Sequence, residues 1–114
     1  MTLLPDALKA SIPPLYATES EADPRVQAKL FTPWTRWTWY VIEHDGEDLC
    51  FGLVDGFERE LGYFSLRELE SIRGPGGLLI ERDLHFQPIP LSQLQQSLET
   101  AGIHPRLPFQ DRTR

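Results

Sequence analysis

Residues 37–64 read WTWYVIEHDGEDLCFGLVDGFERELGYF, and this stretch decides the fold. Residues 37–43 are rich in aromatic and β-branched side chains, and residues 49–55 form a second apolar run, so each predicts a strand. The Asp45-Gly46 pair between them is typical of a tight hairpin. A second turn then leads into a further predicted strand at residues 60–64.

The pattern extends outward on both sides of this stretch. Residues 26–31 predict one more strand upstream, and residues 79–87 are a candidate fifth strand downstream. Strands joined by short hairpins lie next to each other and run antiparallel. The sequence therefore predicts an α+β fold: a four- to five-stranded antiparallel meander, its first four strands in sequential order, with two or three short helices packed on it.

Three segments have helical patterns. Apolar residues recur at every fourth position in residues 3–12. Ser65 and Glu68 have the spacing of a capping box, in which each side chain bonds the other residue's backbone amide, so a helix is expected to begin there and to stop before Gly74. Residues 91–102 form an amphipathic pattern that closes on a glycine.

The length and the cysteine content limit the organisation of the chain. Its 114 residues suit one domain, expected over residues 1–102, with residues 103–114 as a loosely packed or disordered tail. Cys50 is the single cysteine, so no internal disulfide can form, and its apolar neighbours predict a small buried side chain. The N-terminus lacks a signal-peptide pattern, and no stretch is long and apolar enough to span a membrane. A cytoplasmic protein without membrane contact is expected.

The net charge argues against one class of function. At −6, the chain lacks the excess of positive charge with which proteins hold duplex nucleic acid. A local basic patch is still compatible with the sequence, because Arg67, Arg73 and Arg82 lie within one short stretch. An acidic surface also suits a basic partner, although the simplest interpretation is that the charge keeps the protein soluble.

A cluster of aromatic residues is one candidate binding surface. Trp34, Trp37, Trp39 and Tyr40 lie close together around Arg36. Such a group can stack on bases or anchor a protein partner. Alternatively, Trp37 and Trp39, which share one strand face, belong to the core. Trp34 lies in a predicted turn, so it is expected to be the most exposed of the three tryptophans and is the preferred functional aromatic.

The candidate fifth strand carries a possible metal site. Glu81, Asp83 and His85 alternate along it and so share one face of a strand. Two carboxylates and an imidazole can ligate a divalent cation. The alternative is a solvated face whose carboxylates pair with Arg73 and Arg82, an arrangement worth little energetically.

Other polar residues have structural interpretations. Ser65 is better explained as a helix cap than as a nucleophile, and His44 lies in a hairpin turn, where histidines are usually exposed. Residues 74–77 read Gly-Pro-Gly-Gly, but they follow a helix and so lack the helix N-terminus of a phosphate-binding loop.

Four segments carry a family resemblance: residues 31–40 (FTPWTRWTWY), 51–54 (FGLV), 62–75 (GYFSLRELESIRGP) and 80–84 (IERDL). In this order they resemble domain of unknown function family 2958, and the similarity spans nearly the whole chain. The resemblance implies a small single-domain bacterial protein of the kind often carried by plasmids and integrative elements. It implies no activity and supplies no catalytic residue.

The leading hypothesis is therefore a non-enzymatic binding or accessory module of a bacterial mobile element that acts by contacting another protein. One alternative is a nucleic-acid-binding factor whose aromatic-arginine surface comprises Trp34, Arg36, Trp37, Arg67, Arg73 and Arg82. A metal-dependent enzyme is a further alternative. Because the sequence identifies no held acid–base pair, the interpretation leans away from an enzyme, and no cofactor is expected. The two free edges of a meander also allow a homodimer.

Overall fold

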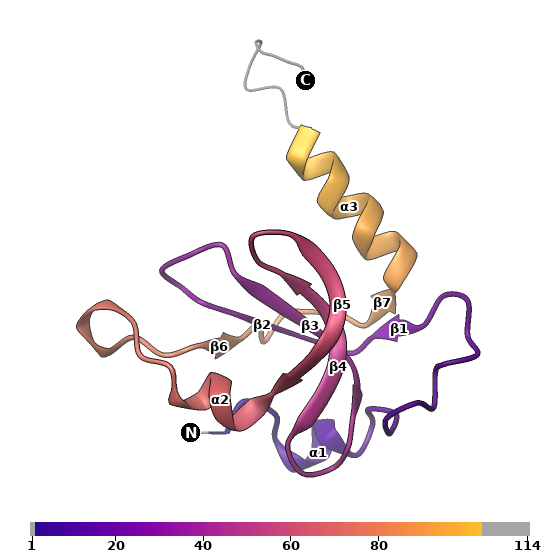
Figure 1. The fold of residues 1–114 in the computed structure, drawn as a ribbon, viewed down its shortest axis with the longest axis horizontal. Coiled ribbons are helices and arrows are strands. Elements are labelled where there is room, and N and C mark those ends of the chain that lie inside the picture. The colour runs from indigo at the N-terminus through magenta and orange to yellow at the C-terminus, as the bar shows by residue number, and fades with distance from the viewer. Residues whose placement is uncertain (1, 104–114) are drawn as a thin grey trace.

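The computed structural model describes residues 2–103, which form an α+β fold built on two antiparallel sheets (Figure 1). The larger sheet has five strands in the order β5-β4-β3-β2-β6, and β1 and β7 form a small second sheet. The strands are β1 (Arg25–Val26), β2 (Ala28–Phe31), β3 (Thr38–His44), β4 (Leu49–Asp55), β5 (Arg59–Ser65), β6 (Glu81–Arg82) and β7 (Ile89–Pro90). The helices are α1 (Asp6–Lys9), α2 (Leu66–Ser71) and α3 (Leu91–Ile103), with a 3₁₀ turn, η1 (Pro75–Gly77).

The predicted meander is confirmed, since β2, β3, β4 and β5 lie side by side in sequential order. Two predicted strands are shorter than expected. The segment at residues 26–31 divides between the two sheets, because Val26 pairs with β7 whereas Ala28 pairs with Val41 of β3. The candidate fifth strand at residues 79–87 is reduced to the two residues of β6, after which the chain turns at residues 84–85.

The helices follow the sequence with some changes in length. The helix predicted at residues 3–12 is only one turn, while Leu3 and Leu4 lie before it and are buried. The Ser65 hydroxyl caps α2 by accepting a hydrogen bond from the Glu68 amide at 3.2 Å. The return bond of the predicted capping box, from Glu68 to the Ser65 amide, is absent among the described residues. Asp48 supports the cap instead, because its carboxylate accepts from the Ser65 hydroxyl at 2.7 Å.

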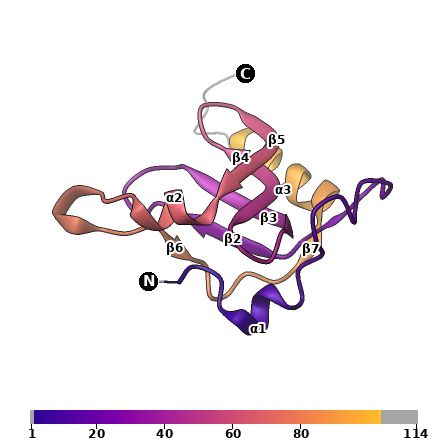
Figure 2. The same ribbon diagram turned by 60° about the horizontal axis from the view of Figure 1, so that its bottom comes forward.

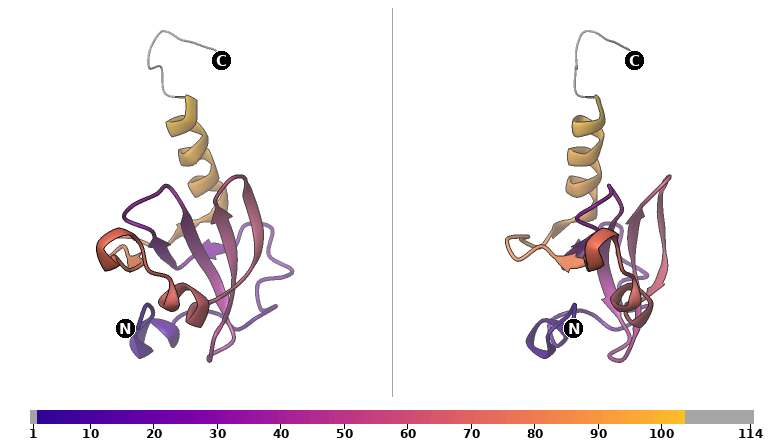
Figure 3. Two further views of the ribbon diagram at one scale, coloured as in Figure 1. Left: turned by 60° about the vertical axis from the view of Figure 1, so that its left-hand side comes forward. Right: turned by 90° about the vertical axis from the view of Figure 1, so that its left-hand side faces the viewer.

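The larger sheet separates two apolar clusters, one on each face. The first is covered by the N-terminal segment and α2 and contains Trp39, Cys50 and Leu66. The second contains Leu53 of β4 and is covered by α3 through Leu91. Figures 2 and 3 show α1 and α3 on opposite sides of the sheets, and Figure 3 shows α3 running away from them. In the described part of the chain, no helix has both the length and the apolar character needed to cross a bilayer.

The expected tail at residues 103–114 falls outside the described residues, apart from Ile103 at the end of α3. The amphipathic pattern at residues 91–102 is confirmed as α3. Its first turns carry the buried Leu91 and Leu94.

Candidate functional site

A bulge between β3 and β4 places an acidic side chain on an unexpected face of the sheet. Val41 pairs with Gly52, yet the next pair joins Glu43 to Phe51, so Ile42 is one residue extra on β3. Bulges re-aim side chains in this way and are common beside functional sites. With strict alternation Glu43 would share the face of Val41. The bulge instead sets it beside Phe51, facing the loop at residues 16–24.

Glu43 is almost completely buried, with 3% of its surface exposed, and its carboxylate holds this loop. One oxygen accepts a hydrogen bond from the Tyr16 amide at 2.8 Å. The other accepts from the Thr18 amide at 2.9 Å and from the Thr18 hydroxyl. Burial alone would raise the pKa of Glu43, but the hydrogen bonds from Thr18 and Tyr16 outweigh it and lower the pKa. Glu43 is therefore a charged anchor for the loop.

Tyr16 is the residue that this anchor holds in an unusual backbone conformation. Its φ of +70° lies in the left-handed region, which non-glycine residues rarely adopt and which costs about 1–3 kcal/mol. The Tyr16 side chain is 61% exposed, and its ring centroid lies 6.5 Å from that of Tyr63 on β5. Tyr63 in turn lies 5.0 Å from the ring of Phe51. Three aromatic rings thus meet where the loop crosses β4 and β5.

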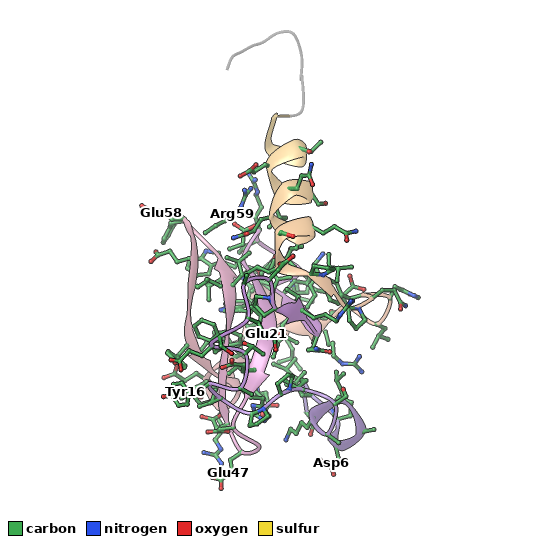
Figure 4. All side chains as sticks on the ribbon, turned by 90° about the vertical axis from the view of Figure 1, so that its right-hand side faces the viewer. Asp6, Tyr16, Glu21, Glu47, Glu58 and Arg59 are labelled. Carbon is green, nitrogen blue, oxygen red and sulfur yellow. The ribbon has the colours of Figure 1, made fainter. Side chains whose placement is uncertain are left out.

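These rings line an open hollow of about 410 Å³ between the loop and the sheet, which we call the tyrosine groove. Figure 4 shows Tyr16 and Glu21 on one side of the molecule, with Tyr16 next to the β4–β5 hairpin. The groove is lined by Tyr16, Thr18, Glu19, Glu21, Ala22, Pro24, Ile42, Glu43, Phe51, Leu61, Tyr63 and Leu91.

Hydrogen bonds also hold the far end of the loop. The Asp23 carboxylate accepts hydrogen bonds from the Ser92 amide at 2.8 Å and from the Ser92 hydroxyl at 2.6 Å, at the first turn of α3. These bonds lower the pKa of Asp23. The Leu91 amide also donates to the Pro24 carbonyl at 2.8 Å. The tyrosine groove is therefore held at both ends and is preformed.

The outer edge of β5 runs beside this groove. β5 is the end strand of its sheet, and no strand in residues 2–103 covers its other side. Leu61 and Tyr63 on this strand are each 50% exposed and both line the groove. A free strand edge and an aromatic hollow thus adjoin.

A second hollow, of about 700 Å³, lies at the end of the β4–β5 hairpin, and we call it the hairpin-tip pocket. It brings together the predicted residues Arg36 and Trp37 with Phe57 and Arg59. Phe57 is 95% exposed, and its ring meets Trp37 edge-on at 5.3 Å. Asp55 also lines the pocket and pairs with Arg59 at 3.4 Å, so positive charge there is balanced by carboxylates.

The preferred functional aromatic, Trp34, lies in the turn between β2 and β3, as predicted. It is half-buried against the first apolar cluster, and its ring lies so close to Gly74 that a Cβ there would come within 2.5 Å of it. Trp34 and Trp37 are both half-buried and Trp39 is buried, so the expectation that Trp34 is the most exposed tryptophan stays a prediction. Trp39 is buried, which confirms its core interpretation, whereas Trp37 is half-buried and shared with the hairpin-tip pocket.

The three predicted arginines have separate local roles. The Arg82 side chain donates to the Leu3 carbonyl at 3.2 Å, so it holds the N-terminal segment. Arg73 is exposed and donates to the Glu70 carbonyl at 2.8 Å, at the end of α2. Arg67 is exposed on α2, where its amide donates to Asp48. None of the three lines the tyrosine groove or the hairpin-tip pocket.

The candidate metal ligands do not form a cation site in the described residues, where no group of three or more such side chains could hold a metal ion. The reason is that β6 ends at Arg82, so Glu81, Asp83 and His85 do not alternate along one strand. Asp83 instead accepts a hydrogen bond from the His85 amide at 2.9 Å and lies 3.8 Å from the Lys29 ammonium.

His44 and Cys50 lie together in the core. The expectation that His44 is exposed is wrong: it is the last residue of β3 and is 3% exposed. Its Nδ1 lies 3.1 Å from the Leu49 carbonyl and 3.5 Å from the Cys50 sulfur, and its Nε2 has no hydrogen-bond partner within residues 2–103. Cys50 is buried as predicted, and burial raises the pKa of its thiol to about 12, so it is an inert side chain.

The tyrosine groove escaped the sequence reasoning. The sequence patterns assign no candidate site to residues 17–25, and simple strand alternation would place Glu43 on the opposite face of the sheet. One signal was present: a glycine inside a strand, here Gly52, often marks a bulge or a close backbone approach. A Cβ on Gly52 would lie 1.8 Å from the Tyr40 carbonyl oxygen, so the close approach requires glycine.

Comparison with known proteins gives a family but no activity. A family model described as "Protein of unknown function (DUF2958)" matches residues 4–104. No curated protein and no solved structure matches the chain.

Proposed function

The chain belongs to the DUF2958 family, whose function is unknown, and we propose that it is a protein-binding module that docks an extended segment of a partner along β5. The observation that carries this proposal is the free outer edge of β5. Unpaired N–H and C=O groups at a sheet edge are a template for a further strand, and many peptide-binding domains use them in this way.

The residues of β5 support the proposal that its free edge binds a partner, because the edge lacks the features that usually protect an exposed strand. Natural proteins protect edges with short strands, prolines, bulges or charges. β5 is seven residues long, its pairing with β4 is regular, and its only charged residues, Arg59 and Glu60, stand at its start. The remainder presents Leu61 and Tyr63 to solvent beside the tyrosine groove. A strand added here would bring alternate side chains over that groove.

In this proposal the protein is a non-enzymatic accessory factor of a bacterial mobile element and acts in the cytoplasm. The family resemblance supports the mobile-element setting. The single cysteine suits a reducing compartment.

Site-specific photocrosslinking tests the proposal. The photoreactive amino acid p-benzoylphenylalanine is placed at position 61 in one variant and at position 47 in a matched control, since Glu47 is exposed in the β3–β4 turn. In lysate of a bacterial host, position 61 is expected to give a discrete adduct that excess wild-type protein abolishes and excess Leu61→Lys protein does not. The same adducts from both positions, or none from position 61, would refute edge docking. An adduct of twice the chain mass identifies the occupant as a second copy of this chain.

A second candidate is single-stranded nucleic acid at the hairpin-tip pocket. Its support is the exposed Phe57 ring beside Trp37 and two arginines, an arrangement that can stack bases. Fluorescence anisotropy of a labelled oligonucleotide at two salt concentrations tests it. Salt-dependent binding that Phe57→Ser abolishes and Arg67→Gln preserves supports this candidate, and unchanged anisotropy at micromolar protein rejects it.

A further inference from the structure

The charged residues that line the tyrosine groove are all acidic. Three glutamates, Glu19, Glu21 and Glu43, are among its twelve lining residues, and none of the twelve carries a positive charge. Desolvation raises the pKa of Tyr63, and so do the neighbouring Tyr16 and the negative charges of Glu43 and Glu19. The field at the aromatic rings is therefore negative. A side chain that enters the groove meets an environment that favours a cation.

The aromatic surface of the groove suits a cation with an apolar stem. Tyr16 and Tyr63 lie 6.5 Å apart with their planes inclined at 57°, so each offers part of a ring face to solvent. A lysine or arginine head group over such a face is attracted by the ring quadrupole. The methylene stem of the same side chain can cover Phe51 and Leu61, as long cationic side chains often do.

The groove is already in place before a ligand arrives. Glu43 holds Tyr16 in its left-handed conformation, and Asp23 fixes the other end of the loop to Ser92 of α3. Because the loop is already ordered, binding does not cost the conformational entropy that a flexible loop would lose.

We propose that the tyrosine groove selects a lysine or arginine side chain of a partner segment paired with β5, so that the partner is an extended basic peptide. This inference rests on the proposed docking at β5 and adds the chemistry of the occupant. The cation would lie over Tyr16 and Tyr63, with Glu19 and Glu21 at the rim. Neutral and acidic segments lack the charge that these four residues favour.

The test compares three fluorescein-labelled nonapeptides in which threonine alternates with lysine, with norleucine or with glutamate. Binding is measured by anisotropy at about 0.15 M salt, where distant charges are screened over about 8 Å. The lysine peptide is expected to bind the wild-type chain most tightly. Glu19→Gln/Glu21→Gln should raise its Kd about fivefold, which combines two exposed charge interactions. The matched control Glu47→Gln/Glu99→Gln has the same net charge and should change the Kd less than about twofold.

The aromatic contribution is tested separately at Tyr63. Tyr63→Phe keeps the ring and should preserve the preference for lysine, whereas Tyr63→Leu should weaken binding of the lysine peptide about threefold. Equal affinity for the lysine and norleucine peptides, or equal losses in the two glutamine double variants, would overturn the basic specificity. Failure of all three peptides to bind would overturn it as well. Edge docking itself is judged independently, by the crosslink at position 61.

Discussion

Replacement of Glu43 by glutamine tests whether one buried carboxylate builds the tyrosine groove. Glutamine has nearly the same shape, so packing is kept while the charge and one acceptor oxygen are lost. The amide oxygen can still accept from Thr18, but the NH₂ group then faces the Tyr16 amide, so two donors oppose each other. We therefore expect the variant to fold with a loosened loop rather than to lose its core.

The magnitude follows from the contacts. A hydrogen bond to a charged group contributes about 1.5–3 kcal/mol, and a buried amide left without an acceptor costs about 1–3 kcal/mol. Glu43→Gln loses the bond to Tyr16 at 2.8 Å and weakens the two bonds to Thr18. The free energy of unfolding should fall by about 2–3 kcal/mol, out of a total of about 5–15 kcal/mol for a small domain. For a chain of this size the melting temperature should fall by about 8–12 °C.

The pH dependence gives a second, independent signature. The folded pKa of Glu43 is lowered, so its contribution to stability is complete above the unfolded pKa of about 4.3 and is lost as the pH falls through the folded value. The stability difference between wild type and Glu43→Gln should therefore be full at pH 7 and shrink below about pH 4. Other acids with lowered pKa values, such as Asp23, are present in both proteins and cancel in this difference.

Urea denaturation followed by tryptophan fluorescence measures both quantities. Glu47→Gln is the matched control, because Glu47 is exposed in a hairpin turn, and its free energy of unfolding should change by less than about 0.5 kcal/mol. If Glu43→Gln unfolds within 0.5 kcal/mol of wild type (roughly the size of an ordinary surface effect) at pH 7, the carboxylate does not hold the loop. A difference that stays constant down to pH 3 would refute the electrostatic part of the argument.

Two further predictions concern the sheet. Gly52→Ala should destabilise the protein by about 3 kcal/mol or more, because its Cβ would lie 1.8 Å from the Tyr40 carbonyl oxygen, whereas Gly62→Ala enters open space and should cost less than about 0.5 kcal/mol. Urea denaturation of both variants checks this, and equal stability would contradict the close approach at the bulge. Cys50, buried and with its thiol pKa raised to about 12, should resist a thiol-reactive reagent at pH 8 until denaturant is added. Rapid modification of the native chain would show that β4 opens locally.

The meander could be predicted from sequence because its signals are local. Turn residues between β-prone runs fix both the hairpins and the neighbouring order of the strands, and β4 begins and ends where the apolar run at residues 49–55 does. Local signals also explain why the predicted fifth strand, at residues 79–87, is longer than the observed β6. The alternation of polar and apolar residues continues past Arg82 in the sequence. In the structure the Asp83 amide donates a hydrogen bond to the Lys29 carbonyl, and no local sequence pattern reveals that contact.

The structure brings only some of the predicted site residues together, because closeness in the sequence does not show which face a side chain occupies. Arg36 and Trp37 do lie together, yet their companions Phe57 and Arg59 come from a different hairpin. The tyrosine groove is harder still, since Tyr16 and Tyr63 are brought together by tertiary structure alone. The bulge that redirects Glu43 depends on the backbone pairing of β3 with β4. Its only trace in the sequence is Gly52, the partner of Val41.

Three energetically unfavourable features converge on one loop, and their coincidence argues for function over simple packing. The sheet accepts a bulge at Ile42, Tyr16 takes a left-handed conformation, and Glu43 is buried as an anion. A loop that only had to cover the sheet could do so with an apolar residue at position 43 and a glycine at position 16, at lower cost. Costly conformations such as the left-handed backbone of Tyr16 persist only where the surrounding structure enforces them, and they are common at binding sites. Here it fixes one aromatic ring beside the free edge of β5, which is where a partner strand would have to lie.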